Sequence, residues 1–175
     1  ANCLRFEKIF INFVQYDEGQ DAGERVQSQA QFYLDIWDAH VLAKDIFSGR
    51  MVALANHSRK KAEKEESKYP QSIFVRMAGV SATQLKEKGK PRSDGMSLAR
   101  QFKITPGNKL PWIVSGESGP GEESDTGLIM PRYKRPEQIV RVGLDDEQFK
   151  KFGAVLDVTV QAWMNRYLTA LDLDR

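Results

Sequence analysis

The sequence predicts an α+β fold, a mostly antiparallel curved sheet with two helices packed on one side of it. Three observations lead to this prediction. Four short strand-like segments lie close together between residues 96 and 143, separated by turn residues, which is typical of antiparallel strands. A long helix with one apolar stripe follows them. A second amphipathic helix is predicted in the first half, after two strands. Apolar stripes have to be covered, and we expect the sheet to cover them.

The chain is predicted to begin with a β-hairpin. Residues 4–16 carry apolar side chains on both alternating faces, and Lys8 and Asn12 interrupt one of these faces. Residues 17–23 form a polar, glycine-containing turn, and residues 25–35 return as the second strand.

A helix is predicted to follow this hairpin. Asp35 or Asp38 can cap it, so that it starts near Trp37. The pair Ser48-Gly49 either bends or divides the helix, because glycine weakens a helix interior by about 1 kcal/mol. Residues 58–68 mix lysine and glutamate, and form either the solvated end of this helix or an exposed linker.

The middle of the chain is predicted to hold one strand and a basic loop, and a series of strands comes next. Residues 72–80 form the single strand, and residues 81–95 form the polar, lysine-rich loop. A glycine- and glutamate-rich loop is expected over residues 117–127. The strands of the series are expected at residues 96–104, 110–116, 128–133 and 138–143, in an antiparallel meander.

The chain is predicted to end in a long, well-capped helix. Asp145 stands at the N-cap position with Gln148 three residues later, which is the spacing of a capping box. Leu144 and Phe149 occupy the two positions of a hydrophobic staple. The apolar stripe recurs at three- and four-residue steps, at Phe149, Phe152, Leu156, Thr159, Trp163, Tyr167 and Leu171.

Length and composition predict a single domain over residues 1–175. It consists of a β-β-α-β half (1–81), a basic loop (82–95) and a β-β-β-β-α half (96–171). The formal net charge is only +2, so a basic surface has to come from local clustering. The one cysteine excludes an internal disulfide, and no apolar run is long enough for a membrane span or a signal peptide. We expect a cytoplasmic protein with no membrane partner.

Residues with catalytic or metal-binding chemistry form no recognisable pattern, so the sequence predicts a protein that is not an enzyme and needs no cofactor. His40 and His57 have no metal-ligand spacing with a cysteine, and Cys3 has no activating neighbour. The glycines of residues 116–121 fit neither a dinucleotide-binding nor a phosphate-binding loop. The acidic residues of 117–125 match no calcium loop, and a solvated hairpin loop is the favoured interpretation.

Basic residues interleaved with aromatic residues are the strongest functional signal. Lysine and arginine neutralise phosphates, and aromatic rings stack on unpaired bases at roughly 1–3 kcal/mol each. We therefore expect a non-enzymatic protein that binds single-stranded nucleic acid, with DNA favoured over RNA, on a basic sheet face. Strict alternation along the strand places Arg100 on the same sheet face as Phe102. Its guanidinium lies either at the solvent-exposed rim of that face or against a ligand. The expected binding residues on the sheet are Arg76, Arg100, Lys103, Trp112, Arg132 and Tyr133. The loop with Lys86, Lys88, Lys90 and Arg92 is expected to surround the nucleic-acid backbone.

The alternative hypothesis is a protein-interaction or scaffold component. The aromatic stripe of the last helix, with Trp163 and Tyr167 near its end, has more apolar surface than one small sheet covers. That helix would then pair with a second copy of the chain or with another protein.

The second half resembles a known superfamily. Four antiparallel strands lead into a helix through Gly143-Leu144-Asp145-Asp146-Glu147-Gln148-Phe149, which resembles the Whirly and transcriptional positive-coactivator superfamily. This resemblance implies single-stranded DNA binding on a curved sheet and assembly through the helices. The whole chain is also similar to proteins carried by conjugative elements of Gram-positive bacteria, in Phe32–Asp35, Asp94–Leu98 and Gly119–Glu123. That similarity implies a role around DNA transfer or maintenance.

Overall fold

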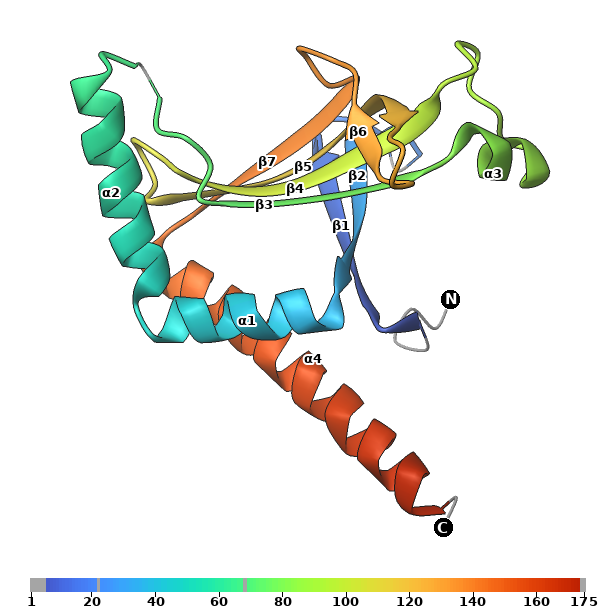
Figure 1. Ribbon diagram of the computed structural model, residues 1–175. Helices are drawn as coiled ribbons and strands as arrows, with labels where there is room; N and C mark the ends of the chain where they lie inside the picture. The colour runs from blue at the N-terminus through green and yellow to red at the C-terminus, as the bar shows by residue number, and fades with distance from the viewer. Residues whose placement is uncertain (1–5, 22, 68, 174–175) are drawn as a thin grey trace.

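The computed structural model describes residues 6–21, 23–67 and 69–173, with side chains as far as Thr169. The predicted α+β fold is confirmed, with a curled antiparallel sheet and helices against it (Figure 1). Four helices, rather than the two expected, lie in this described part of the chain. Cys3 and the first residues of the predicted first strand lie outside it, as does the side chain of Leu171.

The first half begins with the predicted hairpin, which forms a two-stranded sheet of its own. β1 (Lys8–Tyr16) pairs antiparallel with β2 (Val26–Asp35). Of the two candidate caps, Asp35 is the one that accepts a hydrogen bond from the backbone N–H of Trp37. It starts α1 (Ile36–Phe47).

Ser48-Gly49 divides the predicted helix, because Gly49 adopts a left-handed conformation with φ of 78° between α1 and α2 (Arg50–Lys64). Most of the lysine- and glutamate-rich segment forms the end of α2, which was one of the two interpretations.

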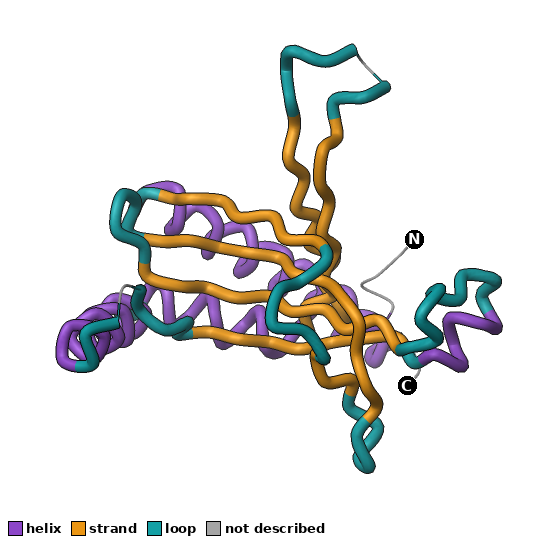
Figure 2. Tube along the Cα trace, turned by 90° about the horizontal axis from the view of Figure 1, so that it is seen from above, coloured by secondary structure: helices purple, strands orange, loops and turns teal. Residues whose placement is uncertain are grey.

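The second sheet has five strands and differs from a simple meander. β3 (Phe74–Val80) pairs with β4 (Ser97–Pro106), and β4 pairs with β5 (Trp112–Glu123). Both β6 (Ile129–Pro131) and β7 (Gln138–Leu144) pair with β5. β6 pairs only with residues 121–123 at the C-terminal end of β5, and β7 pairs with residues 112–118 of β5 (Figure 2).

β5 runs through residues that we expected to form a loop, and close packing explains why. A Cβ atom on Gly116 would lie 2.5 Å from the Phe13 ring, and one on Gly121 would lie 2.7 Å from Ile129. These glycines therefore mark places where another element approaches the strand, rather than a flexible loop. The expected basic loop also contains a short helix, α3 (Ala82–Glu87), capped by the Ser81 hydroxyl.

The last helix, α4 (Asp146–Leu173), starts with the predicted capping box. Gln148 N–H donates to the Asp145 carboxylate at 2.7 Å, and the Asp145 N–H donates to the Gln148 side chain at 3.0 Å. The sheet covers only the start of the stripe, where Phe149 stacks on Trp112 with ring centroids 4.3 Å apart.

α1 covers the middle of the α4 stripe and runs antiparallel to it. Lys44 forms an ion pair with Asp157 at 2.9 Å, and Trp37 meets Trp163 with ring centroids 5.7 Å apart. No helix among the described residues combines the length and hydropathy that a membrane crossing requires.

We call the side of the five-stranded sheet that carries Phe102 the inner face. The hairpin and the start of α4 pack on it, and they make one core with the sheet. The opposite side, which carries Lys103 and Glu117, is the outer face. The hairpin leaves the sheet at a steep angle (Figure 2), so it covers only part of the inner face.

The contact at Gly116 predicts a large effect of a small substitution. Gly116→Val should destabilise the protein by about 1–3 kcal/mol, because its side chain would collide with Phe13 and Ala30 of the hairpin. Chemical denaturation followed by tryptophan fluorescence measures the change. Gly23→Ala is the control, since its added methyl group meets no atom within 4 Å. Equal stability of both variants would contradict the packing of the hairpin described above.

Candidate nucleic-acid interface

The fold leaves two adjoining grooves beside the hairpin, and Arg100 lines both of them. We call the larger one, of about 810 Å³, the cationic groove; it lies between β2, β3, β4 and α3. We call the smaller one, of about 490 Å³, the amide groove; it lies between β2, β4, β5 and β7. Gln31 also lines both, so the two grooves are continuous.

Arg100 occupies this position because of where it stands in β4. It lies two residues before Phe102 on the inner face, and the hairpin rings that cover Phe102 do not extend over it. Its guanidinium lies 6.0 Å from the centre of the Tyr33 ring. It forms no ion pair with a carboxylate of the described residues.

The charge of Arg100 is therefore incompletely compensated. Removal from water lowers the pKa of its guanidinium, which nevertheless stays charged at neutral pH. A cation that is partly buried without a counter-ion loses hydration free energy. An anion bound in the groove would restore that loss.

Further cations line the cationic groove. Two of them are neutralised, since Lys8 pairs with Asp35 at 2.9 Å and Arg76 pairs with Asp38 at 2.8 Å. Lys88 and Lys90 also line it and are exposed, and neither forms an ion pair within the described residues. The groove thus has an excess of positive charge that is available to a ligand.

The hairpin contributes aromatic surface beside these charges. Phe10 and Tyr33 are cross-strand partners with ring centroids 5.1 Å apart, and they are 42% and 38% exposed. Rings with this exposure can stack on unpaired bases. Because the Tyr33 ring also faces Arg100, stacking and charge lie next to each other in this groove.

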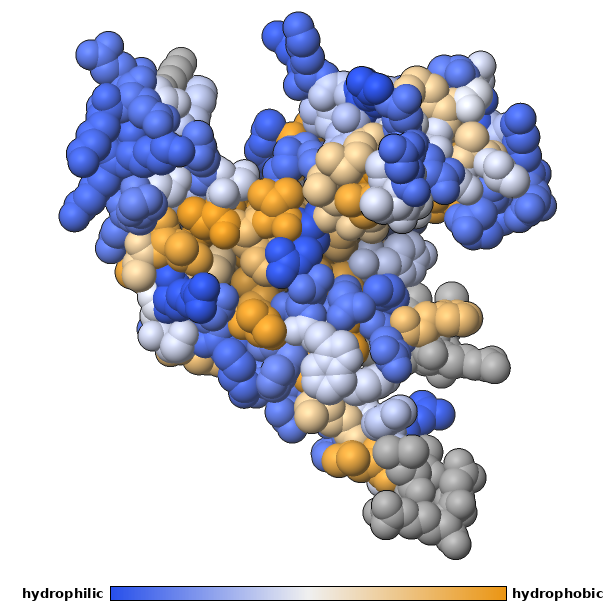
Figure 3. Space-filling view, viewed as in Figure 1, coloured by the Kyte–Doolittle hydropathy of each residue, from blue (hydrophilic) through white to orange (hydrophobic). Residues whose placement is uncertain are grey.

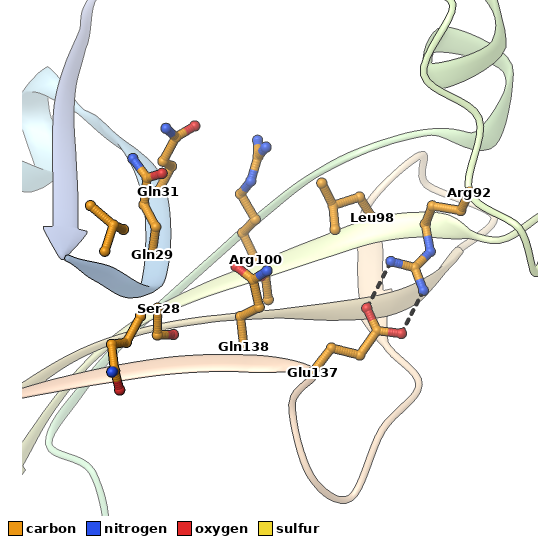
Figure 4. Close-up of a pocket in the computed structure, with 11 residues that line it drawn as sticks. Ser28, Gln29, Gln31, Arg92, Leu98, Arg100, Glu137 and Gln138 are labelled. Carbon is orange, nitrogen blue, oxygen red and sulfur yellow. Dashed lines mark hydrogen bonds and ion pairs between the residues drawn. The ribbon is translucent and has the colours of Figure 1, made fainter. Parts of the chain in front are cut away.

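The amide groove has a different chemistry. Uncharged polar side chains from β2, β5 and β7 dominate its wall, and Figure 4 shows them around Arg100. Its other charged residues neutralise each other, because Arg92 donates two hydrogen bonds to Glu137, at 2.8 and 2.9 Å. Arg92 also donates to the Asp94 carboxylate, so this arginine has two carboxylate partners.

The structure separates the residues that we expected on one basic face. Arg76 and Arg100 lie on the inner face and line the cationic groove, together with Lys88 and Lys90 from the segment around α3. Lys86 is exposed on α3 and does not line either groove. The expectation that the sheet residues share one basic face is wrong, because Lys103 lies on the outer face, opposite Arg76 and Arg100.

Several of the other expected residues have partners elsewhere. Lys103 lies on the outer face and forms an ion pair with Glu117 at 2.7 Å. Arg132 is exposed and forms an ion pair with Glu122.

Tyr133 packs over Gly119. Its burial, and to a smaller extent Glu117, raise the pKa of its hydroxyl to about 12.

Trp112 is a core residue and not a stacking platform for bases. Only 3% of its surface is exposed, and its indole N–H donates to the Asp146 carboxylate at 2.8 Å. β-strand alternation places it on the inner face under the start of α4, where Phe149 covers it. The sequence alone could not distinguish this packing from an open face.

Sequence reasoning missed the hairpin as a contributor to the site. Phe10, Gln31 and Tyr33 of the hairpin were not among the expected residues, yet they lie in or beside the grooves, and Gln138 of β7 was missed as well. The interruption of the first strand by Lys8 and Asn12 was the available signal, because it marks the hairpin face that is not packed in the core. Within the described residues, no group of three or more His, Cys, Asp or Glu could hold a metal ion.

The Arg92 cluster predicts a pH dependence of stability. Hydrogen bonds from Arg92 hold the pKa of Glu137 and of Asp94 below their ordinary values of 4.5 and 3.8. A lowered folded-state pKa contributes stability that is present above the ordinary pKa and is lost as the pH falls. Glu137→Gln should therefore be less stable than the natural protein at pH 7, and the difference should shrink as the pH falls below 4.5.

Urea denaturation at several pH values measures this difference. Glu123→Gln is the control, because Glu123 is exposed and forms no ion pair with a described residue. A Glu137→Gln difference that stays constant between pH 7 and pH 3 would contradict the ionic origin of the effect.

Comparison with known proteins identifies no relative. The chain matches no family model, no curated protein and no solved structure.

Proposed function

We propose that this protein is a non-enzymatic binder of single-stranded nucleic acid, DNA in preference to RNA, and that the strand lies in the two continuous grooves beside the hairpin. The observation that carries the proposal is Arg100, a partly buried cation that lines both grooves and has no carboxylate partner within the described residues. A phosphate would compensate its charge.

The surroundings of Arg100 support a nucleic acid over a small anion. Lys88 and Lys90 extend the positive charge along the cationic groove, as a chain of phosphates requires. Phe10 and Tyr33 offer exposed rings for unpaired bases, which a duplex would keep stacked inside. The resemblance of the second half to Whirly proteins is consistent with this function, and the similarity to proteins of conjugative elements suggests cytoplasmic DNA transfer or maintenance as its setting.

Binding should depend on the unpaired cations of the groove. Arg100→Met and the double variant Lys88→Ala/Lys90→Ala should each weaken binding of a single-stranded oligonucleotide about tenfold at low salt. Each lost phosphate contact should reduce the slope of log affinity against log salt by roughly one. Fluorescence anisotropy with a labelled 16-mer at several salt concentrations measures both quantities.

The control is the double variant Lys60→Ala/Lys64→Ala, which removes two exposed lysines of α2, away from the grooves. Arg100→Met should melt at the same or a higher temperature than the natural protein, because it removes an uncompensated charge. Absence of binding at low salt, or equal loss in the control, would refute the proposal.

A second candidate function, assembly through α4, also has a specific observation in its favour. Trp163 meets Trp37 at the start of α1, and α4 continues beyond this point to Leu173. Tyr167 and Leu168 on this extension are 48% and 56% exposed. Figure 1 shows the extension projecting away from the rest of the molecule. An exposed apolar helix of this kind is typical of an interaction surface.

Assembly through α4 predicts a dimer that a charge would dissociate. Sedimentation equilibrium should give twice the chain mass for the natural protein and the single chain mass for Tyr167→Glu. Lys151→Glu, on the exposed side near the start of the same helix, is the control and should not change the mass. A monomeric natural protein at high concentration would exclude this candidate function.

A further inference from the structure

We infer that the amide groove holds a nucleobase and reads its edge, while the adjoining phosphate lies against Arg100, so that the protein distinguishes between base sequences. This inference rests on the proposed function. It goes beyond that function, because neutralised phosphates alone would bind every sequence equally.

The two grooves differ in what they can recognise. The cationic groove contains the unpaired lysines, which suit phosphates. In the amide groove, Arg92 is paired with Glu137 and Asp94, so Arg100 is the only cation that lines this groove without a carboxylate partner among the described residues. Its volume of about 490 Å³ falls within the roughly 300–1,000 Å³ of small-molecule sites.

Some of the polar side chains in the amide groove have partners in the protein. Gln29 donates to the Asn12 side chain at 2.9 Å, and Gln27 donates to the Asp17 carboxylate at 3.0 Å. These bonds connect the two strands of the hairpin and hold that wall of the groove.

Gln31, Gln138 and Ser118 are available to a ligand. Their side chains make no hydrogen bond to another residue in the described part of the chain. Gln31 comes from β2 and Gln138 comes from β7, and both reach the same groove as Arg100 of β4 (Figure 4). A ligand between these strands would therefore meet amides from two separate elements.

Amides match bases better than they match phosphates. A glutamine side chain both donates and accepts hydrogen bonds, as the edges of bases do, whereas a phosphate only accepts. Sequence-specific recognition of single strands uses such bonds to splayed-out bases. Leu98 and Val26 add apolar surface to the same groove, against which the flat ring can lie.

The position of Arg100 sets the orientation of the nucleotide. Because Arg100 lines both grooves, a phosphate beside its guanidinium can have neighbouring phosphates near Lys88 and Lys90. The base of that nucleotide then points into the amide groove. One nucleotide of the bound strand is read in this way, while the rest of the strand is held through charge and stacking.

Homopolymers and an abasic strand test the inference with the full chain. Fluorescence anisotropy compares labelled 16-mers of thymine, adenine and cytosine with a 16-mer that lacks bases. At least one homopolymer should bind ten times more tightly than another and than the abasic strand. The double variant Gln31→Ala/Gln138→Ala should reduce the preference among homopolymers to about twofold. Its salt slope should not change, because no charge is lost.

The matched control is Gln161→Ala, which removes an exposed amide of α4 outside the grooves and should leave the preference intact. Thermal melting followed by circular dichroism verifies that the variants fold. Equal binding of all homopolymers, with weaker binding of the abasic strand, would overturn the inference while the proposed function, with its base stacking, stands. A preference that survives in Gln31→Ala/Gln138→Ala would also overturn it. If no oligonucleotide binds, the proposed function itself fails, and the inference fails with it.

Discussion

Packing around Phe102 is the interaction on which the rest of the structure depends. This ring is fully buried, and rings from four other elements surround it with centroids 5.8 to 6.4 Å away: Phe13, Phe32, Phe74 and Phe152. These rings belong to β1, β2, β3 and α4, so one residue of β4 joins the hairpin, the sheet and the last helix. Aromatic pairs of this kind contribute about 0.5–1.5 kcal/mol each beyond the burial of area.

The same packing creates the grooves. The hairpin must come close to β5 for its rings to reach Phe102, and the missing side chain of Gly116 permits this approach. Since the hairpin leaves the sheet at a steep angle (Figure 2), it covers only part of the inner face. Arg100 is on the same face just beyond the cover, so one strand contributes to both the core and the candidate site.

Ion pairs within the chain neutralise part of its positive charge. The net charge is only +2, and many of the cations lie within ion-pair distance of a carboxylate from the same chain. Figure 3 shows hydrophilic residues spread over much of one side of the molecule. Lys88, Lys90 and Arg100, which form no ion pair within the described residues, lie together at the cationic groove and make it locally positive.

The sequence by itself determined most of the local structure: the hairpin, the Asp145 cap, the helix after the hairpin and the α+β class. It left open whether Asp35 or Asp38 caps that helix and whether Ser48-Gly49 bends or divides it. These features depend on neighbours a few residues apart, and periodicity and capping chemistry report such neighbours directly. Only the tertiary structure decided that Trp112 is buried, that α1 covers the middle of α4, and that β7 pairs with β5. It also decided which cations have partners. Those outcomes depend on contacts between residues far apart in the chain, and a pattern within one segment carries no information about what that segment will meet.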